Sequence, residues 1–263
     1  AEIGKNFIYT EEELSVEENL QRAMELVLVA KQSGATVAKF QCHVFEDEQK
    51  KRSEKRYEWI RRNERATPYF EFWKPLKDYC DSVGIEFLCT PMSKQAAIKI
   101  GDFVKRWNVG SADIVDVELL EYLKSTGKPI IISTGMSTEY QIYDVMKFLE
   151  DKVELINYCV SIYPCPIYKI DLSKMLKLGV YNKPVGFSDH SLSIEIPVIA
   201  VRMGAVAIEK HFTFDRDLFG PDHKVSLLPG EFKKMVELCK LAKTDGDSFN
   251  EEKSYWENFR KYN

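Results

Sequence analysis

Two histidines stand where a parallel sheet could place them side by side. His190 ends the segment KPVGFSDH and His211 follows AVAIEK, and both segments are short apolar runs of the kind that form buried strands. Neighbouring strands lie about 4.8 Å apart, so the two imidazoles could reach one ion. Two imidazoles with several waters make an open first-row metal site, which acts as a Lewis acid on a carbonyl group. The alternative is that each histidine only hydrogen-bonds within a polar rim; the alignment of the pair favours the metal.

Polar side chains also end the other predicted strands. Because side chains alternate between the two faces of a strand, residues two apart share a face. The pairs that share a face are Lys39 with Gln41, Ser111 with Asp113, Ser188 with His190, and Glu209 with His211, and the strand-end hydroxyls are Thr90, Ser111, Ser133, Ser161 and Ser188. The sequence therefore predicts a polar ring that contains a lysine, a glutamine, hydroxyls, an acid and two histidines.

Lys39 could do either of two kinds of chemistry. As a Schiff-base nucleophile it needs a depressed pKa, whereas as a fixed cation it would pair with a carboxylate or a phosphate. The nearby hydroxyls favour a phosphate, since they donate hydrogen bonds while the lysine supplies charge. For Ser133 and Thr134 a helix N-cap is a strong alternative. Lys210 is out of phase with His211, so we expect it to point toward the helical layer.

The other two histidines are weaker candidates. His223, in GPDH, could line a pocket or cap a turn made by Gly220 and Pro221. His43 follows a predicted strand beside a charged loop, and a structural hydrogen bond is the favoured role.

The elements that position these residues alternate regularly along the chain. Ser15 and Glu18 form a capping box for a helix over residues 15–34. Strands are predicted at residues 1–4, 36–41, 85–91, 104–111, 128–135, 153–161, 183–190 and 205–213, each followed by a helix, with residues 42–67 as a long loop or solvated helix over one end. Eight such units predict an α/β fold, a (β/α)8 TIM barrel in a single domain over residues 1–245, with a polar, aromatic tail at 246–263. A doubly wound open sheet is the competing architecture.

Composition excludes several partners. The 263 residues carry a net charge of −4 with pI near 5.8, which gives no electrostatic case for nucleic acid or an anionic membrane. No run is long and apolar enough to span a membrane and no signal-peptide pattern opens the chain, so we expect a cytoplasmic protein. The six cysteines show no paired zinc spacing, which favours reduced thiols.

The ordered motifs resemble those of the sialic acid synthase family, N-acetylneuraminate synthase-like enzymes that condense phosphoenolpyruvate with an N-acetylated hexose. They run over nearly the whole chain as AEIGKN, VAKFQ, FLCTPM, VGSAD, KPIIISTGMST, SIYPCP, GFSDHS, AIEKHFT and GPDH. The resemblance implies a barrel that binds phosphoenolpyruvate, a divalent ion (Mn²⁺ or Mg²⁺) and an open-chain sugar.

The resemblance also assigns roles to individual residues. It implies His190 and His211 as metal ligands, and Asp113 as an acid near the reacting carbons that orients or deprotonates water. It implies phosphoenolpyruvate contacts at Lys39, Thr90, Ser111, Ser133 and Ser188, and sugar contacts at Gln41, Tyr163 and Asp222. The implied reaction is attack of phosphoenolpyruvate C3 on the sugar aldehyde, addition of water at C2 and loss of phosphate, giving a nonulosonic acid.

This chain departs from the family pattern in four places. Asn108 replaces a strand-end lysine, and Arg106, two residues back on the same face, is expected to compensate in part. Ile8 stands near an expected glutamate and Ser161 replaces an asparagine. The family's C-terminal antifreeze-like domain is not found, so we expect the barrel domain only.

These departures keep two alternatives open beside a metal-dependent synthase. One is a non-catalytic barrel homologue that binds metal or anion as a partner of another protein, and the other is a Schiff-base aldolase that uses Lys39. The expected partners are small-molecule substrates, with a homodimer and a separate protein that supplies the missing domain as further hypotheses.

Overall fold

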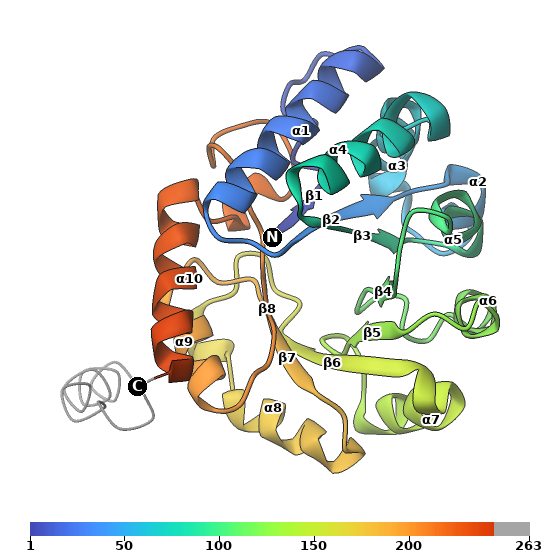
Figure 1. Ribbon diagram of the computed structural model, residues 1–263. Helices are drawn as coiled ribbons and strands as arrows, with labels where there is room; N and C mark the ends of the chain where they lie inside the picture. Colours follow the sequence, from blue (N-terminus) through green and yellow to red (C-terminus); the bar gives the residue numbers. More distant parts are fainter. Residues whose placement is uncertain (245–263) are drawn as a thin grey trace.

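A computed structural model describes residues 1–244 of the chain, in which parallel strands form an inner layer and helices an outer one (Figure 1). The strands are β1 (Glu2–Gly4), β2 (Val37–Cys42), β3 (Glu86–Pro91), β4 (Trp107–Val109), β5 (Ile130–Ser133), β6 (Val153–Cys159), β7 (Val185–Asp189) and β8 (Ile208–Lys210). The sequence predicted each of these strands and their order. The predicted tail, residues 246–263, lies outside the described residues.

Helices follow every strand, as the alternation predicted. They are α1 (Val16–Gln32), α2 (Phe45–Glu48), α3 (Tyr57–Ala66), α4 (Lys74–Val83), α5 (Lys94–Ile100), α6 (Val117–Ser125), α7 (Glu139–Leu149), α8 (Leu172–Lys177), α9 (Glu195–Arg202) and α10 (Pro229–Thr244). Short 3₁₀ turns occupy η1 (Glu54–Arg56), η3 (Glu150–Lys152), η4 (Ile167–Lys169), η5 (Leu178–Tyr181) and η6 (His223–Val225), and η2 (Tyr69–Trp73) is a π-helical turn before α4. The capping box of α1 is present, with Ser15 and Glu18 each bonded to the other's backbone.

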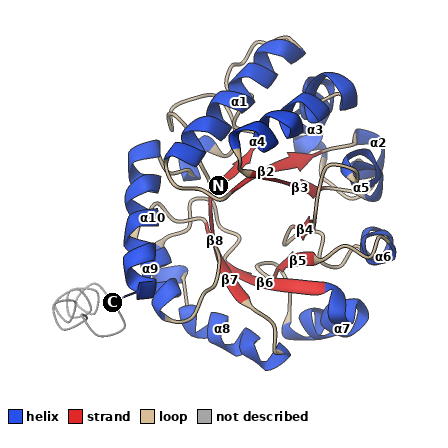
Figure 2. Cartoon of the chain, viewed as in Figure 1, coloured by secondary structure: helices blue, strands red, loops and turns tan. Residues whose placement is uncertain are grey.

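The strands pair in parallel within two sheets, β1-β2-β3 and β4-β5-β6-β7-β8. A bridge between Glu2 and His211, with the Phe212 amide donating to the Glu2 carbonyl at 2.9 Å, joins β8 to β1. Between β3 and β4 a side-chain bond takes the place of a backbone ladder, since Asn108 Nδ2 donates to Thr90 Oγ1 at 2.8 Å. Figure 2 shows the strands arranged as a ring with the helices outside.

The core lies in two places. Most buried apolar side chains pack between the strands and the helices, and a second, small cluster of Leu88, Ile131 and Leu155 comes from β3, β5 and β6. Thr90 and Ser133 lie two residues beyond Leu88 and Ile131 on their strands, and therefore on the same face. The small apolar layer thus forms the floor beneath the polar strand ends.

Two sequence predictions need correction here. The strand predicted at residues 104–111 is much shorter, because β4 ends at Val109 and Ser111 and Asp113 lie in a turn. Strand alternation therefore does not govern how those two side chains are directed. The segment 42–67, predicted as a long loop or a solvated helix over one end, contains α2, η1 and α3, and residues 53–56 are exposed. The prediction missed that one face of α3 is packed, since Ile60 and Arg62 are buried.

The cysteines agree with the sequence-based expectation, since all six are free and five of them are buried. In the described part of the chain, no helix combines the length and the apolar composition that crossing a membrane requires.

Candidate active site

One cavity of about 460 Å³ opens at the carboxyl ends of the strands, and it collects the eleven residues to which the family resemblance assigned a role. These residues are Lys39, Gln41, Thr90, Ser111, Asp113, Ser133, Tyr163, Ser188, His190, His211 and Asp222. Eleven positions spread over the length of the chain thus meet in one space, as expected where parallel strands end at the same edge.

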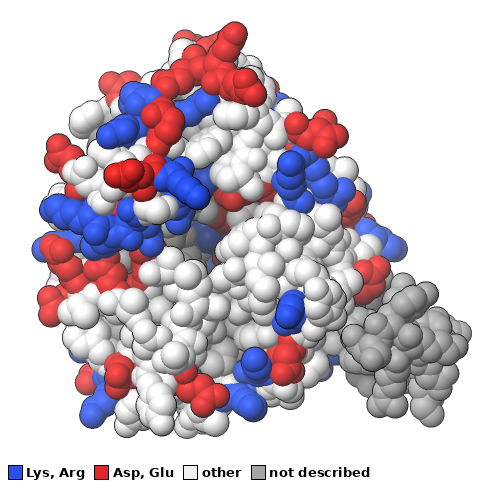
Figure 3. Space-filling model, turned by 180° about the vertical axis from the view of Figure 1, so that it is seen from behind, with Lys and Arg blue, Asp and Glu red and all other residues white. Residues whose placement is uncertain are grey.

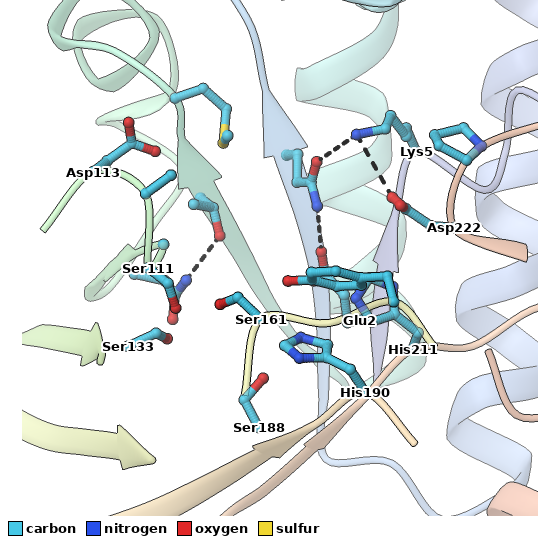
Figure 4. Close-up of a pocket in the computed structure, with 18 of the residues that line it drawn as sticks. Glu2, Lys5, Ser111, Asp113, Ser133, Ser161, Ser188, His190, His211 and Asp222 are labelled. Atoms are coloured by element: carbon cyan, nitrogen blue, oxygen red, sulfur yellow. Dashed lines mark hydrogen bonds and ion pairs between the residues drawn. The ribbon is translucent and has the colours of Figure 1, made fainter. Parts of the chain in front are cut away.

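The two histidines lie side by side at the ends of β7 and β8. The register pairs Ser188 with Glu209 and Asp189 with Lys210, so one further step brings His190 next to His211. Their ring centroids are 5.6 Å apart, and Figure 4 shows both rings at one side of the cavity. A metal ion lies about 2.1 Å from an imidazole nitrogen, so rings at this separation can share one ion.

The state of the two rings suits metal ligation. His190 Nδ1 donates to the Val160 carbonyl at 2.8 Å, which leaves its Nε2 as the ligating atom. His211 Nδ1 is buried and finds no hydrogen-bond partner among the described residues. Burial lowers the pKa of His190, and lowers that of His211 to about 3, so both rings are neutral near pH 7. Residues 1–244 contain no group of three or more His, Cys, Asp or Glu that could hold a metal ion. An open site of the predicted kind takes its remaining ligands from water or substrate.

Lys39 lies at the centre of a buried network of charges. Its Nζ is 2.7 Å from the Glu2 carboxylate and 3.5 Å from that of Glu209, and it donates to Thr90 Oγ1 at 3.3 Å. Burial alone would lower the pKa of Lys39, but Glu2 and Glu209 outweigh this and hold it above the ordinary value. Lys39 is therefore a fixed cation. A Schiff-base lysine needs the opposite shift.

The hydroxyl groups lie where a phosphate cradle was expected. Ser188 Oγ donates to Glu209 at 2.8 Å, and Ser111 Oγ accepts from the Gly135 amide at 3.2 Å. Asn108 is buried and lines the same cavity, with its Oδ1 unpartnered among the described residues. The predicted cradle would therefore combine hydroxyls with one amide, with Lys39 as the adjacent cation.

A second group of polar side chains connects two of the predicted sugar contacts. Lys5 Nζ donates to Gln41 Oε1 at 3.0 Å and lies 3.5 Å from Asp222, as the dashed lines in Figure 4 show. Gln41 Nε2 in turn donates to Glu2 at 2.8 Å. Lys5 outweighs burial and lowers the pKa of Asp222, which is therefore ionised. Tyr163, the third predicted sugar contact, packs its ring 4.2 Å from that of His190.

Asp113 lines the cavity but lies across it from the histidines (Figure 4). Its carboxylate forms an ion pair with Arg52, which follows α2. Burial raises the pKa of Asp113 to about 6 despite this partner. The predicted role near the reacting carbons stays a prediction, while Glu2 and Glu209 are the acids beside Lys39.

Arg106 does not compensate for Asn108. Its guanidinium pairs with Glu86 at 2.7 Å and with Glu154 at 2.8 Å, and both acids stand at the starts of their strands. Because active residues lie where the strands end, Arg106 is at the opposite end of the fold from the cavity. Strand alternation predicted that Arg106 shares a face with Asn108. It could not predict that Arg106 lies at the end of the strand remote from the cavity.

The remaining predictions about lysine and histidine are resolved by direct contacts. Lys210 points away from the cavity and forms a buried ion pair with Asp189, as its phase predicted. His43 is bonded to Glu48 at 2.9 Å, which is the structural role favoured for it. His223 Nδ1 lies 2.7 Å from Thr213 Oγ1 and packs against Gly220, so it belongs to a turn and does not line the cavity.

Five charged residues of the cavity were not among the predicted site residues. Glu2 begins β1 and Lys5 follows it, Glu209 was noted only for its phase with His211, and Lys55 and Arg56 come from η1. The available signal was an ionisable residue inside a short apolar strand, where an unpaired charge is costly. Glu2 and Lys39 pair across neighbouring strands, a partnership that the sequence alone does not reveal.

Comparisons with known proteins give one family. The NeuB family model matches residues 26–248. An uncharacterized protein of Methanocaldococcus jannaschii is 39% identical over 252 residues, which cover 91% of this chain and 72% of that protein. The N,N'-diacetyllegionaminic acid synthase of Legionella pneumophila is 37% identical over 261 residues, which cover 90% of this chain and 72% of that enzyme.

A solved structure shares the fold. The N-acetylneuraminic acid (sialic acid) synthetase of Leptospira borgpetersenii, solved in complex with citrate, superimposes with a TM-score of 0.82 at 28% identity. The superposition covers 98% of this chain and 89% of that one.

Proposed function

Because the chain belongs to the NeuB family, as its motifs predicted, we propose that it condenses phosphoenolpyruvate with an N-acetylated or related sugar aldehyde to give a nonulosonic acid and phosphate. The observation that carries this proposal is the single cavity in which His190 and His211 lie beside Lys39 and the hydroxyl cradle. Two of the relatives support the reaction type by their names, which are those of a legionaminic acid synthase and a sialic acid synthetase.

The metal is the first part of the proposal. A divalent ion, Mn²⁺ or Mg²⁺, held by His190 and His211 would act as a Lewis acid on the sugar aldehyde. The pair supports this assignment because both rings are neutral and His190 is oriented by the Val160 carbonyl. Tyr163 covers the His190 ring and would limit the access of bulk water to that end of the cavity.

The anionic substrate belongs on the other side of Lys39. Thr90, Ser111 and Ser133 would donate hydrogen bonds to the phosphate and carboxylate of phosphoenolpyruvate, while Lys39 supplies the charge. Ser188, which donates its hydroxyl proton to Glu209, would contact the same substrate by packing. Gln41, Lys5 and Asp222 would hold hydroxyl groups of the open-chain sugar, because a carboxylate that accepts, an ammonium group that donates and an amide that does both are held in a fixed chain of bonds. This arrangement orients the two substrates before they react.

The water that adds at C2 requires a proton acceptor. Glu209 suits that step, because its carboxylate is held by Ser188 and Lys39 near the histidines, and Lys39 lowers its pKa against the effect of burial. Asp113 is the second candidate, with a pKa near 6 but with Arg52 as its partner. Proton transfer demands hydrogen-bond reach, so position favours Glu209.

We also propose that the eight strands function as one (β/α)8 barrel. The bridge between Glu2 and His211 and the Asn108–Thr90 side-chain bond support closure at the two places where the sheets meet. Closure would keep the substrates' binding groups on one rigid ring.

Phosphate release tests the proposed function directly. The protein, Mn²⁺, phosphoenolpyruvate and a panel of N-acetylated aldoses should release phosphate, and a chelator should abolish the release. Absence of release with every acceptor at high protein concentration would overturn the proposal.

Two other functions can be separated from this one by simple measurements. A non-catalytic barrel homologue is motivated by Asn108 and by the buried apolar Ile8, and calorimetry that detects binding of neither phosphoenolpyruvate nor Mn²⁺ would favour it. A Schiff-base aldolase would be trapped by borohydride with a keto acid, and the raised pKa of Lys39 argues against that result.

Assembly as a homodimer, or with a separate protein that supplies a further domain, is a hypothesis that sedimentation of the protein and its complexes would test.

A further inference from the structure

A second cavity, of about 650 Å³, lies between α7 and α8. Residues of the loop after β5, the start of α7, the end of β6, α8 and η5 line it. Of these residues only Cys159 also lines the cavity that holds the histidine pair, so the two spaces are distinct. In the view from behind, uncharged atoms predominate below the central hollow, and Lys and Arg atoms occur there only in small groups (Figure 3).

Three exposed lysines line this second cavity. Lys169 belongs to η4, and Lys174 and Lys177 belong to α8. Within residues 1–244 their ammonium groups form no ion pair and no hydrogen bond, and Lys169 only approaches the Tyr168 ring, with its Nζ 5.5 Å from the ring centroid. Three ammonium groups without a bonded partner on one cavity create a positive potential that attracts anions.

Few acids oppose these lysines. Asp171 precedes α8, but its carboxylate accepts from the Ser173 amide at 3.0 Å and from the Ser173 hydroxyl at 2.6 Å, and it does not line the cavity. The bonds from Ser173 chiefly lower the pKa of Asp171, and the two lysines of α8 add to that effect. Among the described residues, Glu139 at the start of α7 is the one acid on the lining. The lining therefore carries three positive charges and one negative charge.

The start of α7 adds a free hydroxyl donor to the same cavity. The Ser137 Oγ atom is buried, lies in the lining and finds no hydrogen-bond partner among the described residues. Thr138, the next residue, is the N-cap of α7 and also lines the cavity, so the positive end of the α7 dipole lies there. An anion with several oxygen atoms would supply the partner that Ser137 lacks.

Buried apolar and aromatic side chains form another part of the wall. Ile142 of α7, Tyr158 of β6 and Leu178 of η5 are each only 7 to 8% exposed, and all three line the cavity. Small-molecule sites commonly have volumes of about 300 to 1,000 Å³ and combine apolar walls with a few polar groups. The second cavity has both properties, so it suits an organic anion better than a bare ion.

We propose that the second cavity binds an organic phosphate, with the phosphate among Lys169, Lys174 and Lys177 near the Ser137 hydroxyl and the organic part against the apolar wall. Phosphate fits better than carboxylate because it offers three strong acceptor oxygens and nearly two negative charges to this set of donors. The inference does not depend on the reaction proposed above, since the two cavities share only one lining residue.

Calorimetry without added metal tests the site with two probes, ADP and inorganic pyrophosphate. We expect ADP to bind with a Kd of about 1 mM or lower, since hydrogen bonds between ammonium groups and phosphate are charge-assisted. ADP should also bind more tightly than pyrophosphate, because only ADP carries an organic part for the apolar wall. Pyrophosphate binding at least as tight as that of ADP would overturn the assignment of an organic phosphate.

Variants locate the bound probe. Lys174→Ala/Lys177→Ala should weaken ADP binding at least about tenfold, because two charged donors are lost. Lys105→Ala/Lys147→Ala removes the same charge from two exposed lysines outside both cavities, and it should leave the affinity unchanged. Glu139→Gln should tighten ADP binding about threefold, since it removes the negative charge of the lining. All the substituted side chains are exposed, and thermal melting verifies that each variant is folded.

Three further results would each overturn the inference. The first is that neither probe binds at millimolar concentration. The second is that Lys174→Ala/Lys177→Ala keeps the affinity of the parent protein, which would place the probe in the cavity of Lys39 and the strand-end hydroxyls. The third is that Lys105→Ala/Lys147→Ala loses as much affinity as Lys174→Ala/Lys177→Ala, which would indicate a general attraction between the protein surface and the anion.

Discussion

Lys39 and Glu2 pair in register on neighbouring strands, and their charged groups meet 2.7 Å apart in the wall of the cavity. Both side chains are almost completely buried, so each charge depends on the other. Removing one partner from a buried pair costs about 3 to 5 kcal/mol because the other charge is left uncompensated.

Replacing Lys39 should therefore damage both stability and turnover. We expect Lys39→Met to lower the free energy of unfolding by about 3 kcal/mol or more and to abolish phosphate release. Lys39→Met/Glu2→Gln should recover part of the stability, because one buried carboxylate is removed, but no activity. Urea unfolding and the phosphate assay measure the two effects separately. Equal stability of the two variants would contradict the coupling between these residues.

The histidine pair makes a prediction about metal binding. His190→Asn and His211→Asn should each weaken Mn²⁺ binding at least about tenfold, since each would remove half of the protein ligands. Electron paramagnetic resonance of free Mn²⁺ gives the affinity without turnover. His223→Asn is the matched control, because His223 is buried in a turn outside the cavity. Undiminished affinity in both variants would place the ion elsewhere.

Replacing Asn108 with lysine would add a cation to the predicted phosphate-binding site. Asn108→Lys should raise the affinity for phosphoenolpyruvate about tenfold, because an ammonium group would replace an amide next to Thr90. The ligand-free variant should melt at a lower temperature than the parent, since burying an unpaired charge is unfavourable. Thermal shifts with and without phosphoenolpyruvate measure both effects. Asn108→Asp should show weaker binding, and tighter binding by that variant would refute the assignment.

The raised pKa of Asp113 predicts how the free energy of unfolding changes with pH. Its folded-state pKa is raised from 3.8 to about 6, so the folded protein holds a proton that the unfolded chain has already released in this range. The stability that Asp113 contributes is therefore complete below pH 3.8 and decreases as pH rises to about 6, by up to about 3 kcal/mol.

Unfolding of Asp113→Asn across this range checks the sign. Relative to the parent protein, the variant should gain stability as pH rises from 4 to 6, whatever the constant cost of leaving Arg52 unpaired. Asp144→Asn, on the exposed face of α7, is the control and should follow the parent profile. A difference between Asp113→Asn and the parent that does not change with pH would contradict the raised pKa.

Much of this architecture follows from local sequence signals. The period of apolar residues and the capping box of Ser15 and Glu18 define α1, and alternation along β7 and β8 placed Ser188, His190 and His211 on one face. Such signals act within one element, so the sequence contains them in full.

Contacts between distant elements were harder to predict. The depth of Arg106, the partnership of Asp113 with Arg52 and the position of Lys5 all depend on how segments far apart in the chain pack. The burial of one face of α3 was missed for the same reason, since the many charges of this segment indicated a solvated surface, while Arg62 is satisfied by carbonyl groups of another loop. A residue type shows that a partner is needed but does not identify it.

The buried ion pair between Lys210 and Asp189 has a consequence for the two histidines. Each partner directly precedes a histidine, on β8 and β7 respectively, and Lys210 also donates to the Ser191 carbonyl. Sliding one strand past the other would separate two charges that have no access to solvent. The buried ion pair on the far side of the strands thus fixes the positions of the His190 and His211 rings. Binding of a metal ion would not have to bring the two rings together.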